Sequence, residues 1–440
     1  MDTRMPSDRE VLALALPALG ALVAEPLYVL GDTAIIGHLG TRPLAGLALA
    51  GLLLSEVLGF CTFLEYGTTA RAARLYGAGQ HEAALDAGVQ ATWLAIGMGI
   101  VLVVVVELAA APALHAMAGG STPAAAQAIE WIRIAALGGP FVLITGAAQG
   151  WMRGFQNTRT PLYVIGAANL ASIFLSAALV FGLDLGIRGS AIANVVAQTA
   201  SGVIFLAILV RKGAPLAPSW ARIRRQLASA RDLGLRTVAF FIAFTVAASV
   251  AARTGDAALA AHQIGAQLWF FTALFLDATA IAAQALIGRL LGAGATDVAH
   301  ALAHRLLWAG TILGVGFAAV LAAGYEVIPA LFTADSPVVD QAHVLWPWLV
   351  LMMPLNGWLF ALDGVLFGAG DLRFMRNVTV LAALGGYVPI ALLTAQEGWG
   401  LTGIWIGLAA FICIRTGVGA LRYRGRRWLV GGAALADEAA

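Results

Sequence analysis

The sequence predicts an all-α integral membrane protein of twelve transmembrane helices, arranged as two six-helix bundles related by a pseudo-twofold axis. Three observations lead to this prediction: the composition, the spacing of the apolar runs, and a repeat between the two halves of the chain. Of the 440 residues, 60% are hydrophobic and 11% are charged, whereas soluble domains are about one-quarter charged. The formal net charge of +2 gives no support for nucleic-acid binding.

Apolar runs long enough to cross a bilayer recur along the whole chain, separated by charged or Gly/Pro-rich breaks. A helix needs about 20 residues to span the hydrocarbon core, and twelve such runs can be counted. Their centres lie near residues 23, 55, 98, 136, 171, 200, 244, 272, 312, 353, 386 and 409. The leader MDTRMPSDRE holds two Arg against three acids and so lacks the basic start of a signal peptide. We expect the first run to be retained as a membrane helix.

Basic residues are distributed unequally between the two alternating sets of loops. One set holds only three, Arg42, Arg188 and Arg253, whereas the other set, which includes both termini, holds twenty Lys and Arg residues. Cytoplasmic loops carry the excess of Lys and Arg in membrane proteins. We therefore expect a multi-pass protein of the cell membrane (inner or plasma membrane) with both termini in the cytoplasm.

The chain repeats itself about halfway along its length. RLYGAG at residues 74–79 returns as RLLGAG at residues 289–294, an offset of 215, and Gly186 and Gly189 return as Gly400 and Gly403, an offset of 214. Matching hexamers in the same loop of each half indicate a duplicated six-helix unit. With an even number of spans per unit, the axis relating the units lies along the membrane normal, and transporters built this way rock about a central cavity.

The repeat and the charged segment between its copies define the predicted domains. The segment RKGAPLAPSWARIRRQLASARD is basic and contains two prolines, which is typical of a cytoplasmic linker at the membrane surface. The predicted domains are an N-terminal lobe of residues 1–211, a basic linker of residues 212–232 and a C-terminal lobe of residues 233–440.

Two acids, Glu25 and Asp32, interrupt the first apolar run, with Tyr28 between them. Seven residues are almost two helical turns, so all three side chains project from one side of a helix. A charged carboxylate at the centre of a span costs roughly 2.5–3.5 kcal/mol, so such groups usually line water or carry a proton. The positions 215 residues later are Phe240 and Ala247. The acidic face therefore belongs to the first lobe only, and we predict Asp32 and Glu25 as proton-coupling residues.

Pro26 and Glu56 bear on how the first helix works. Pro26 frees a backbone carbonyl and favours a bend, so we predict a hinge there. A protonated Glu25 could simply bond to that carbonyl, which leaves its role open. Counting about 1.5 Å per residue from the turn near Gly40 places Glu56 on the second span level with Glu25. If these two face each other, repulsion keeps at least one protonated, and Glu56 stays a possible helix-2 acid.

Polar side chains on the fifth and sixth spans could complete a hydrated pocket around Asp32. The predicted pocket or ion-site neighbours are Tyr28, Asn169, Ser172, Ser176, Asn194 and Gln198. The three on the fifth span fall on one helical face at spacings of three and four. Any of the Ser and Asn residues could instead serve as a small hydrogen-bonding contact between helices.

AEPLYVLGDTAIIGHLG, FLEYGTTARAARLYGAG and RGFQNTRTPL follow one another along the chain. Together they resemble the multidrug and toxic compound extrusion (MATE) family, particularly its DinF-like branch, over nearly the whole length. The resemblance implies a V-shaped transporter of two lobes, with Asp32 as the ion-coupling carboxylate, Tyr28 in its pocket and Asn194 as the polar residue of helix 6. Related members often carry Asn and Asp on helix 5, where this chain has Ser172 and Ser176. The missing carboxylate weakens a Na⁺ site and favours proton exchange.

The sequence therefore predicts a secondary antiporter that exports amphipathic or cationic organic compounds, such as drugs or toxins, in exchange for protons at Asp32. The alternatives are a Na⁺-coupled exporter and a lipid-linked precursor flippase of the same superfamily, which would be expected to show a basic cavity for pyrophosphate. The sequence contains no His-Glu-x-x-His helix, no Gly-x-Ser-x-Gly elbow and no metal-spaced His/Cys set. We expect no enzyme activity, no cofactor and no metal site, and a monomer whose partners are small organic substrates, protons and the bilayer.

Overall fold

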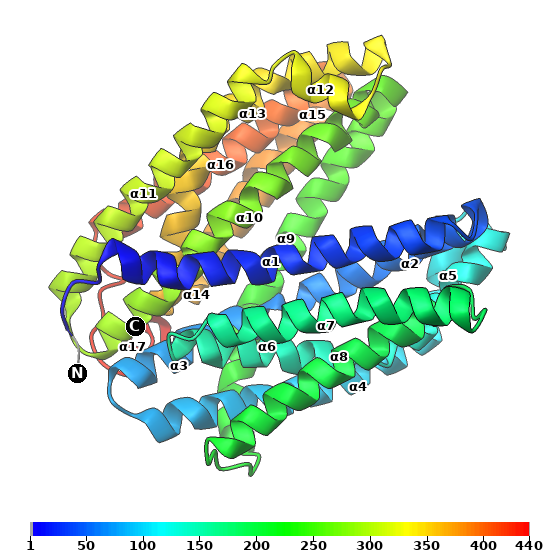
Figure 1. The fold of residues 1–440 in the computed structure, drawn as a ribbon. Coiled ribbons are helices and arrows are strands. Elements are labelled where there is room, and N and C mark those ends of the chain that lie inside the picture. The colour runs from blue at the N-terminus through cyan, green and yellow to red at the C-terminus, as the bar shows by residue number, and fades with distance from the viewer. Residues whose placement is uncertain (1–2, 440) are drawn as a thin grey trace. The chain divides into compact units, whose positions relative to one another are not determined.

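The computed structural model in Figure 1 describes residues 3–439. Contacts divide the chain into two compact units: the N-unit, Leu16–Ala230, and the C-unit, Arg231–Ala440 with Met1–Ala15. All regular secondary structure of the described residues is helical. Within that part of the chain, eleven helices are long and apolar enough to cross a membrane, or twelve if one bent pair counts as a span. The predicted all-α membrane fold is confirmed, and the predicted domain boundaries stay a prediction.

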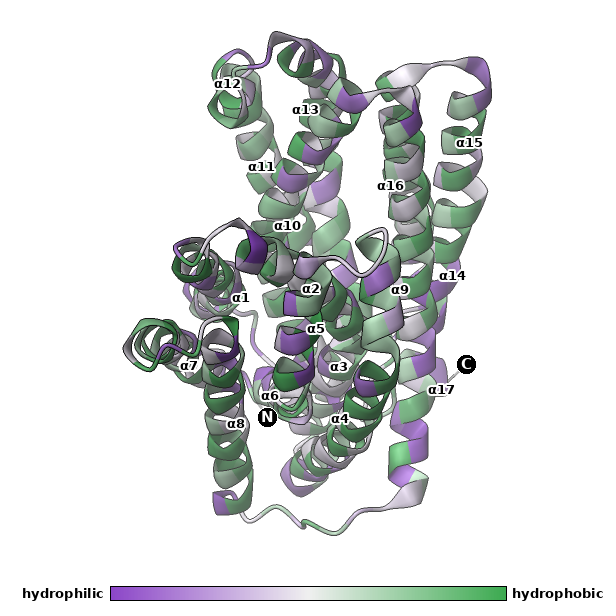
Figure 2. Cartoon of the chain, turned by 90° about the vertical axis from the view of Figure 1, so that its right-hand side faces the viewer, coloured by the Kyte–Doolittle hydropathy of each residue, from purple (hydrophilic) through white to green (hydrophobic). Residues whose placement is uncertain are grey.

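Each unit is built from long apolar helices, because a helix satisfies its own backbone hydrogen bonds within the bilayer. The elements of the first half are α1 (Asp8–Gly37), α2 (Thr41–Gly59), η1 (Phe60–Thr62), α3 (Phe63–Gly77), α4 (His81–Met117), α5 (Pro123–Ala136), α6 (Gly139–Gly154), α7 (Arg159–Ala177), η2 (Ala178–Gly182) and α8 (Ile187–Arg211). The elements of the second half are α9 (Trp220–Thr254), α10 (Asp256–Gly292), α11 (Thr296–Ala323), α12 (Val327–Phe332), α13 (Ser336–Ala369), α14 (Leu372–Ala382), η3 (Ala383–Tyr387), α15 (Val388–Glu397), α16 (Gly400–Arg424) and α17 (Ala436–Ala439). Figure 2 shows that the long helices are mostly hydrophobic, with hydrophilic residues concentrated toward helix ends and in several connections.

The repeat is visible in the backbone as well as in the sequence. Gly40 and Gly255, 215 residues apart, both have positive φ angles, +115° and +134°, and each joins the first two helices of its half. Gly79 and Gly294, also 215 apart, have φ angles of 75° and 76°. Such angles are easy only for glycine, so the two halves share their tight turns.

The fourth span is broken, which the hydropathy pattern did not predict. α5 and α6 meet at an angle of 53° instead of forming one helix centred near residue 136. Pro140 lies in the first turn of α6, where it has no N–H to continue the helix from α5. The corresponding span of the C-unit, α13, is continuous although it contains Pro347 and Pro354.

The fifth span of each half contains one short π-helical segment. η2 continues α7 in the N-unit, and η3 joins α14 to α15 in the C-unit. Insertions of this kind widen a helical turn and are frequent at functional sites. In the N-unit the segment begins two residues after Ser176, which lies on the buried face of α7.

Glycines allow two helices of the C-unit to cross closely. Gly310 and Gly314 on α11 are four residues apart, and both face α13. A Cβ atom added at Gly310 would collide with the backbone oxygen of Gly357, and one added at Gly357 would collide with the oxygen of Gly310. Small residues at this spacing let membrane helices approach each other. The crossing adjoins a large core cluster that includes Trp346, which is 1% exposed.

In each unit the segment that follows the sixth span folds back over the third. In the N-unit, the Trp93 indole of α4 donates to the Leu216 oxygen at 2.8 Å, and the Gln90 amide donates to the Ala217 oxygen at 3.1 Å. In the C-unit, Trp428 is fully buried and stacks near His300 of α11, with ring centroids 6.4 Å apart. The duplication therefore extends to the chain that leaves each bundle.

Candidate functional site

Asp32 lies at the centre of the candidate site, within α1 of the N-unit, and is 2% exposed. The Ser176 hydroxyl of α7 donates to its Oδ1 at 2.7 Å. The Ser190 hydroxyl of α8 donates to its Oδ2 at 2.6 Å. Both carboxylate oxygens are therefore held by hydroxyl groups from two different helices, which fixes the side chain in position.

A tryptophan determines which way the Ser190 hydroxyl points. The Trp131 indole N–H of α5 donates to Ser190 Oγ at 3.0 Å. Because an indole N–H can only donate, Ser190 accepts from Trp131 and directs its own proton to Asp32. Sequence reasoning missed both residues. Ser190 stands one turn before Asn194, a spacing that could have found it, whereas nothing in the sequence separates Trp131 from a packing residue.

Two further hydrogen bonds join α1 to its neighbours beside Asp32. The Asn194 amide of α8 donates to the Tyr28 hydroxyl at 2.8 Å, and Tyr28 is 5% exposed. The Asn169 amide of α7 donates to Glu25 Oε2 at 3.4 Å, a long contact, and Glu25 itself is exposed. The structure thus brings together the acids of α1 with polar residues of α7 and α8.

Ser172 and Gln198 complete the set predicted around Asp32, and they differ in position. Ser172 is 1% exposed on the buried face of α7, between Asn169 and Ser176. Gln198 is half-buried, and its Cβ lies 3.6 Å from the place where a Cβ of Gly138 would be. Gln198 therefore lies by the break between α5 and α6.

Glu56 and Pro26 stay predictions. Glu56 is exposed on α2, and among the interactions described for residues 3–439 Glu25 contacts Asn169 and not Glu56. Pro26 lies inside α1, which continues past it to Gly37.

Among residues 3–439, no ion pair is found at the Asp32 carboxylate. Its hydrogen-bond donors there are the hydroxyl groups of Ser176 and Ser190, and no group of three or more His, Cys, Asp and Glu residues in that range is arranged to hold a metal ion. A buried carboxylate that is held only by neutral donors can take up and release a proton without breaking an ion pair. The arrangement is therefore chemically suited to proton exchange.

The C-unit carries apolar residues where the N-unit carries this polar set. The position 215 residues after Asp32 is Ala247, and the positions 214 after Ser190 and Asn194 are Ile404 and Leu408. These three apolar residues are at most 3% exposed and belong to the C-unit core. The polar site is thus confined to one copy of the duplicated fold.

The C-unit has a different buried charged cluster. The Asp363 carboxylate of α13 pairs with Arg415 of α16 at 2.5 Å and with Arg236 of α9 at 3.0 Å. Both guanidinium groups lie over the Phe240 ring, 5.0 and 5.3 Å from its centroid. Sequence reasoning missed this cluster because its members lie on helices that are far apart along the chain.

Comparison with known proteins places the chain in a family. The MatE family model matches it twice, over residues 17–178 and 233–392. The chain is 33% identical over 426 residues to Protein DETOXIFICATION 44, chloroplastic, of Arabidopsis thaliana, covering 94% of this chain and 81% of that protein. It is 32% identical over 424 residues to DNA damage-inducible protein F of Escherichia coli (strain K12), covering 93% and 90%.

Among solved structures, the fold is similar to that of the Vibrio cholerae MATE transporter VcmN in its bent form. The TM-score is 0.86 with 20% sequence identity, and the similarity covers 96% of each chain. That likeness shows the fold, while the family model covers most of both halves and the two relatives match nearly the whole chain. The chain therefore belongs to the multidrug and toxic compound extrusion (MATE) family of membrane transporters.

Proposed function

We propose that the protein is a secondary antiporter that exports amphipathic or cationic organic compounds in exchange for protons, with Asp32 as the coupling carboxylate. One observation carries this proposal: Asp32 is buried on α1, accepts hydrogen bonds from Ser176 and Ser190, and pairs with no cation in the part of the chain that the structure describes. Membership of a family of multidrug and toxin transporters supports the substrate class.

The exchange follows from the electrostatics of that carboxylate. When Asp32 is ionised it attracts a cationic substrate and accepts the two serine hydroxyl bonds. Protonation removes the charge, weakens those bonds and favours release of the substrate. Pro26 lies six residues before Asp32 on α1, less than two helical turns away, and is where we propose that the helix bends between the two states. The cycle is complete when the proton leaves on the other side of the membrane.

Protons fit the donor set better than Na⁺ does. A sodium ion needs several oxygen ligands, but Ser176 and Ser190 point their hydroxyl protons at Asp32. The Asn194 and Asn169 amides likewise donate from nitrogen, to Tyr28 and Glu25. Glu25 is the second proton-coupling candidate. Sodium coupling is the alternative that the experiment below can recognise.

We also propose that the protein acts as a monomer in the cell membrane with both termini in the cytoplasm. One set of alternating loops holds three Lys and Arg residues, whereas the set that includes both termini holds twenty, and this difference supports the orientation. Protons would then flow inward as the organic compound leaves the cell.

The test is proton movement in proteoliposomes that contain purified protein and an internal pH-sensitive dye. Adding ethidium as a cationic probe should evoke proton movement with the wild-type protein. We expect Asp32→Asn to abolish it, whereas Asp256→Asn, which alters an exposed acid at the start of α10, should retain it. Undiminished proton movement in a folded Asp32→Asn variant contradicts the proposal. Ethidium transport that requires a Na⁺ gradient and moves no protons would instead favour the sodium alternative.

The lipid-linked precursor flippase remains a second candidate because of the Arg236–Asp363–Arg415 cluster. The buried Arg415 and the half-buried Arg236 could bind a pyrophosphate, although both now pair with Asp363. Reconstituted protein would then translocate a fluorescent polyprenyl pyrophosphate, and Arg415→Gln would stop that movement while Asp32→Asn would not. Ethidium transport that is lost in Asp32→Asn and kept in Arg415→Gln favours the antiporter.

A further inference from the structure

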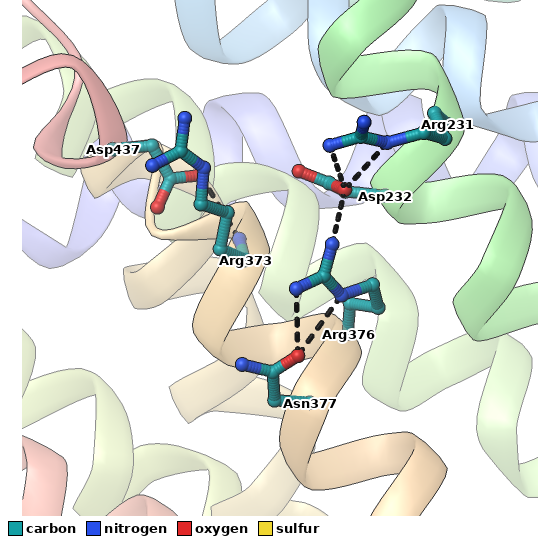
Figure 3. Close-up of polar contacts among 6 residues, drawn as sticks. All are labelled: Arg231, Asp232, Arg373, Arg376, Asn377 and Asp437. Carbon is teal, nitrogen blue, oxygen red and sulfur yellow. Dashed lines mark hydrogen bonds and ion pairs between the residues drawn. The ribbon is translucent and has the colours of Figure 1, made fainter.

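Three arginines gather where α9 enters the C-unit and α14 begins (Figure 3). Asp232 of α9 is 3% exposed, and its Oδ1 accepts from Arg231 Nη2 at 3.2 Å and from Arg376 Nη1 of α14 at 2.5 Å. Arg376 also donates twice to the Asn377 side-chain oxygen, at 2.9 and 2.8 Å. These contacts tie α9 to α14 and hold two guanidinium groups side by side.

Arg373 adds a third arginine at the start of α14. It lies one turn before Arg376 on α14, and its backbone N–H donates to Asp437 Oδ2 at 2.9 Å. Arg373 is exposed, and Figure 3 shows its side chain beside Asp437. Three guanidinium groups therefore face two carboxylates, and burial raises the pKa of the Asp437 carboxyl above its ordinary value. The cluster keeps an excess of positive charge.

This positive charge remains accessible from outside the fold. The Arg231 side chain is 64% exposed and the Arg376 side chain is 23% exposed, whereas the Asp232 side chain between them is 4% exposed. An anion that approaches Arg231 and Arg376 therefore meets guanidinium groups and not the Asp232 carboxylate, whereas the second carboxylate, Asp437, is half-buried. Planar guanidinium groups bind phosphate through paired N–H donors.

Exposed apolar residues continue from the arginines along the same two helices. Leu235 follows Arg231 by four residues on α9 and is 46% exposed. Leu381 follows Arg373 by eight residues on α14 and is 55% exposed. Residues at spacings of four and eight share a helix face. Arg231 and Arg373 thus begin helix faces that become apolar deeper in the span, on α14 after the exposed Asn377.

We propose that Arg231, Arg373 and Arg376 bind the headgroup phosphate of an anionic phospholipid, whose acyl chains lie along the exposed leucines of α9 and α14. A basic cluster directly at the end of membrane helices is the pattern that recognises anionic lipid. The apolar stripes favour a lipid over free phosphate, because only a lipid contacts both parts. With the orientation proposed above, this is a lipid of the cytoplasmic leaflet.

The experiment compares lipid binding to full-length protein in dodecylmaltoside micelles. Dioleoylphosphatidylglycerol and dioleoylphosphatidylcholine are titrated, and bound lipid is measured by native mass spectrometry and by the rise in unfolding temperature. We expect the anionic lipid to bind about tenfold more tightly than the zwitterionic one. The variant Arg231→Gln/Arg373→Gln should lose that preference, and it keeps the pair between Asp232 and Arg376, so the buried acid retains a partner.

The control is Arg211→Gln/Lys212→Gln, which removes two exposed charges at the end of α8 in the N-unit and should keep the preference. If the double variant does not fold, Arg373→Gln alone should weaken anionic-lipid binding about threefold. Equal binding of both lipids to the wild-type protein, or an undiminished preference in the cluster variant, overturns the proposal. Inorganic phosphate that raises the unfolding temperature as much as the anionic lipid also overturns it, in favour of a free-phosphate site.

Discussion

At the scale of single residues, the direction of one hydroxyl bond matters most. Ser190 could in principle donate to Asp32 or accept from it; the Trp131 N–H takes one of its two acceptor lone pairs, which favours an orientation in which the hydroxyl proton points to Asp32. Ser190 therefore supports the ionised carboxylate and opposes the protonated one. Helical spacing predicted that Asn169, Ser172 and Ser176 share one face of the fifth span, but Ser190 of α8 was missed. It could not predict Trp131, because its role depends on a contact between residues 59 positions apart.

We expect Trp131→Phe to move the pH at which transport is half-maximal to a higher value, by up to about one unit. Without the indole N–H, Ser190 is free to accept a hydrogen bond from protonated Asp32, and one hydrogen bond contributes about 0.5–1.5 kcal/mol. The measurement is the pH profile of ethidium transport in proteoliposomes.

Trp151→Phe provides the matched control for that change. Trp151 is 1% exposed in the N-unit, and its indole nitrogen has no hydrogen-bond partner within the described chain. Its replacement should leave the pH profile in place. An identical shift in both variants would show that the Trp131 bond to Ser190 does not set the profile.

At the scale of elements, hydropathy predicted where the spans lie but not how they are shaped. The apolar run around residue 136 is continuous in sequence, yet Pro140 divides it into α5 and α6. Proline does not always have this effect, because α13 continues through Pro347 and Pro354. Whether a proline breaks a span depends on the helices packed around it, and hydropathy does not contain that information.

We expect Gly310→Leu to lower the free energy of unfolding by about 1–3 kcal/mol, the usual cost of overpacking. Its side chain would meet the backbone oxygen of Gly357 and the Ala361 Cβ, which cannot move without separating α11 from α13. Thermal unfolding in detergent measures the loss. Gly316→Leu on the same helix has open space around it and should unfold near the wild-type temperature, and similar losses in both would argue against the glycine crossing.

We expect Trp428→Ala to release the segment after α16 from the C-unit. Trp428 is fully buried against Tyr423 and His300, and truncating a buried tryptophan costs about 3–5 kcal/mol. Trypsin should then cut at Arg426 and Arg427 at least about tenfold faster. Trp220→Ala, at a position 71% exposed, should leave the cleavage rate unchanged, and unchanged cleavage in the Trp428 variant would contradict the docking.

At the scale of the whole molecule, the duplication explains why the architecture could be predicted from the sequence. The turns at Gly40 and Gly255 and the hexamers at residues 74–79 and 289–294 are shared by both halves, so the architecture followed from the repeat. The Arg236–Asp363–Arg415 cluster and the arginines near Asp232 belong to the C-unit alone. A sequence repeat predicts the fold that both halves share, but it does not predict the residues that are particular to one half.

The orientation can be tested with single cysteines after Cys61 and Cys413 are replaced by alanine. We expect Arg42→Cys to react with a membrane-impermeant maleimide on intact cells, because its loop belongs to the outer set. Arg224→Cys should react only after permeabilisation. Both positions are exposed in the structure, so the reverse pattern would show that the topology is inverted.

The apolar counterpart of the site offers a practical use. In the C-unit core, the apolar side chains of Ala247, Ile404 and Leu408 pack at the positions where the N-unit has an acid, a hydroxyl and an amide. Transplanting those three side chains onto positions 32, 190 and 194 is therefore a rational route to an inert, robust protein. Such an inactive variant would serve as an antigen for raising antibodies, as a negative control in drug screening and as a sample for cryo-electron microscopy.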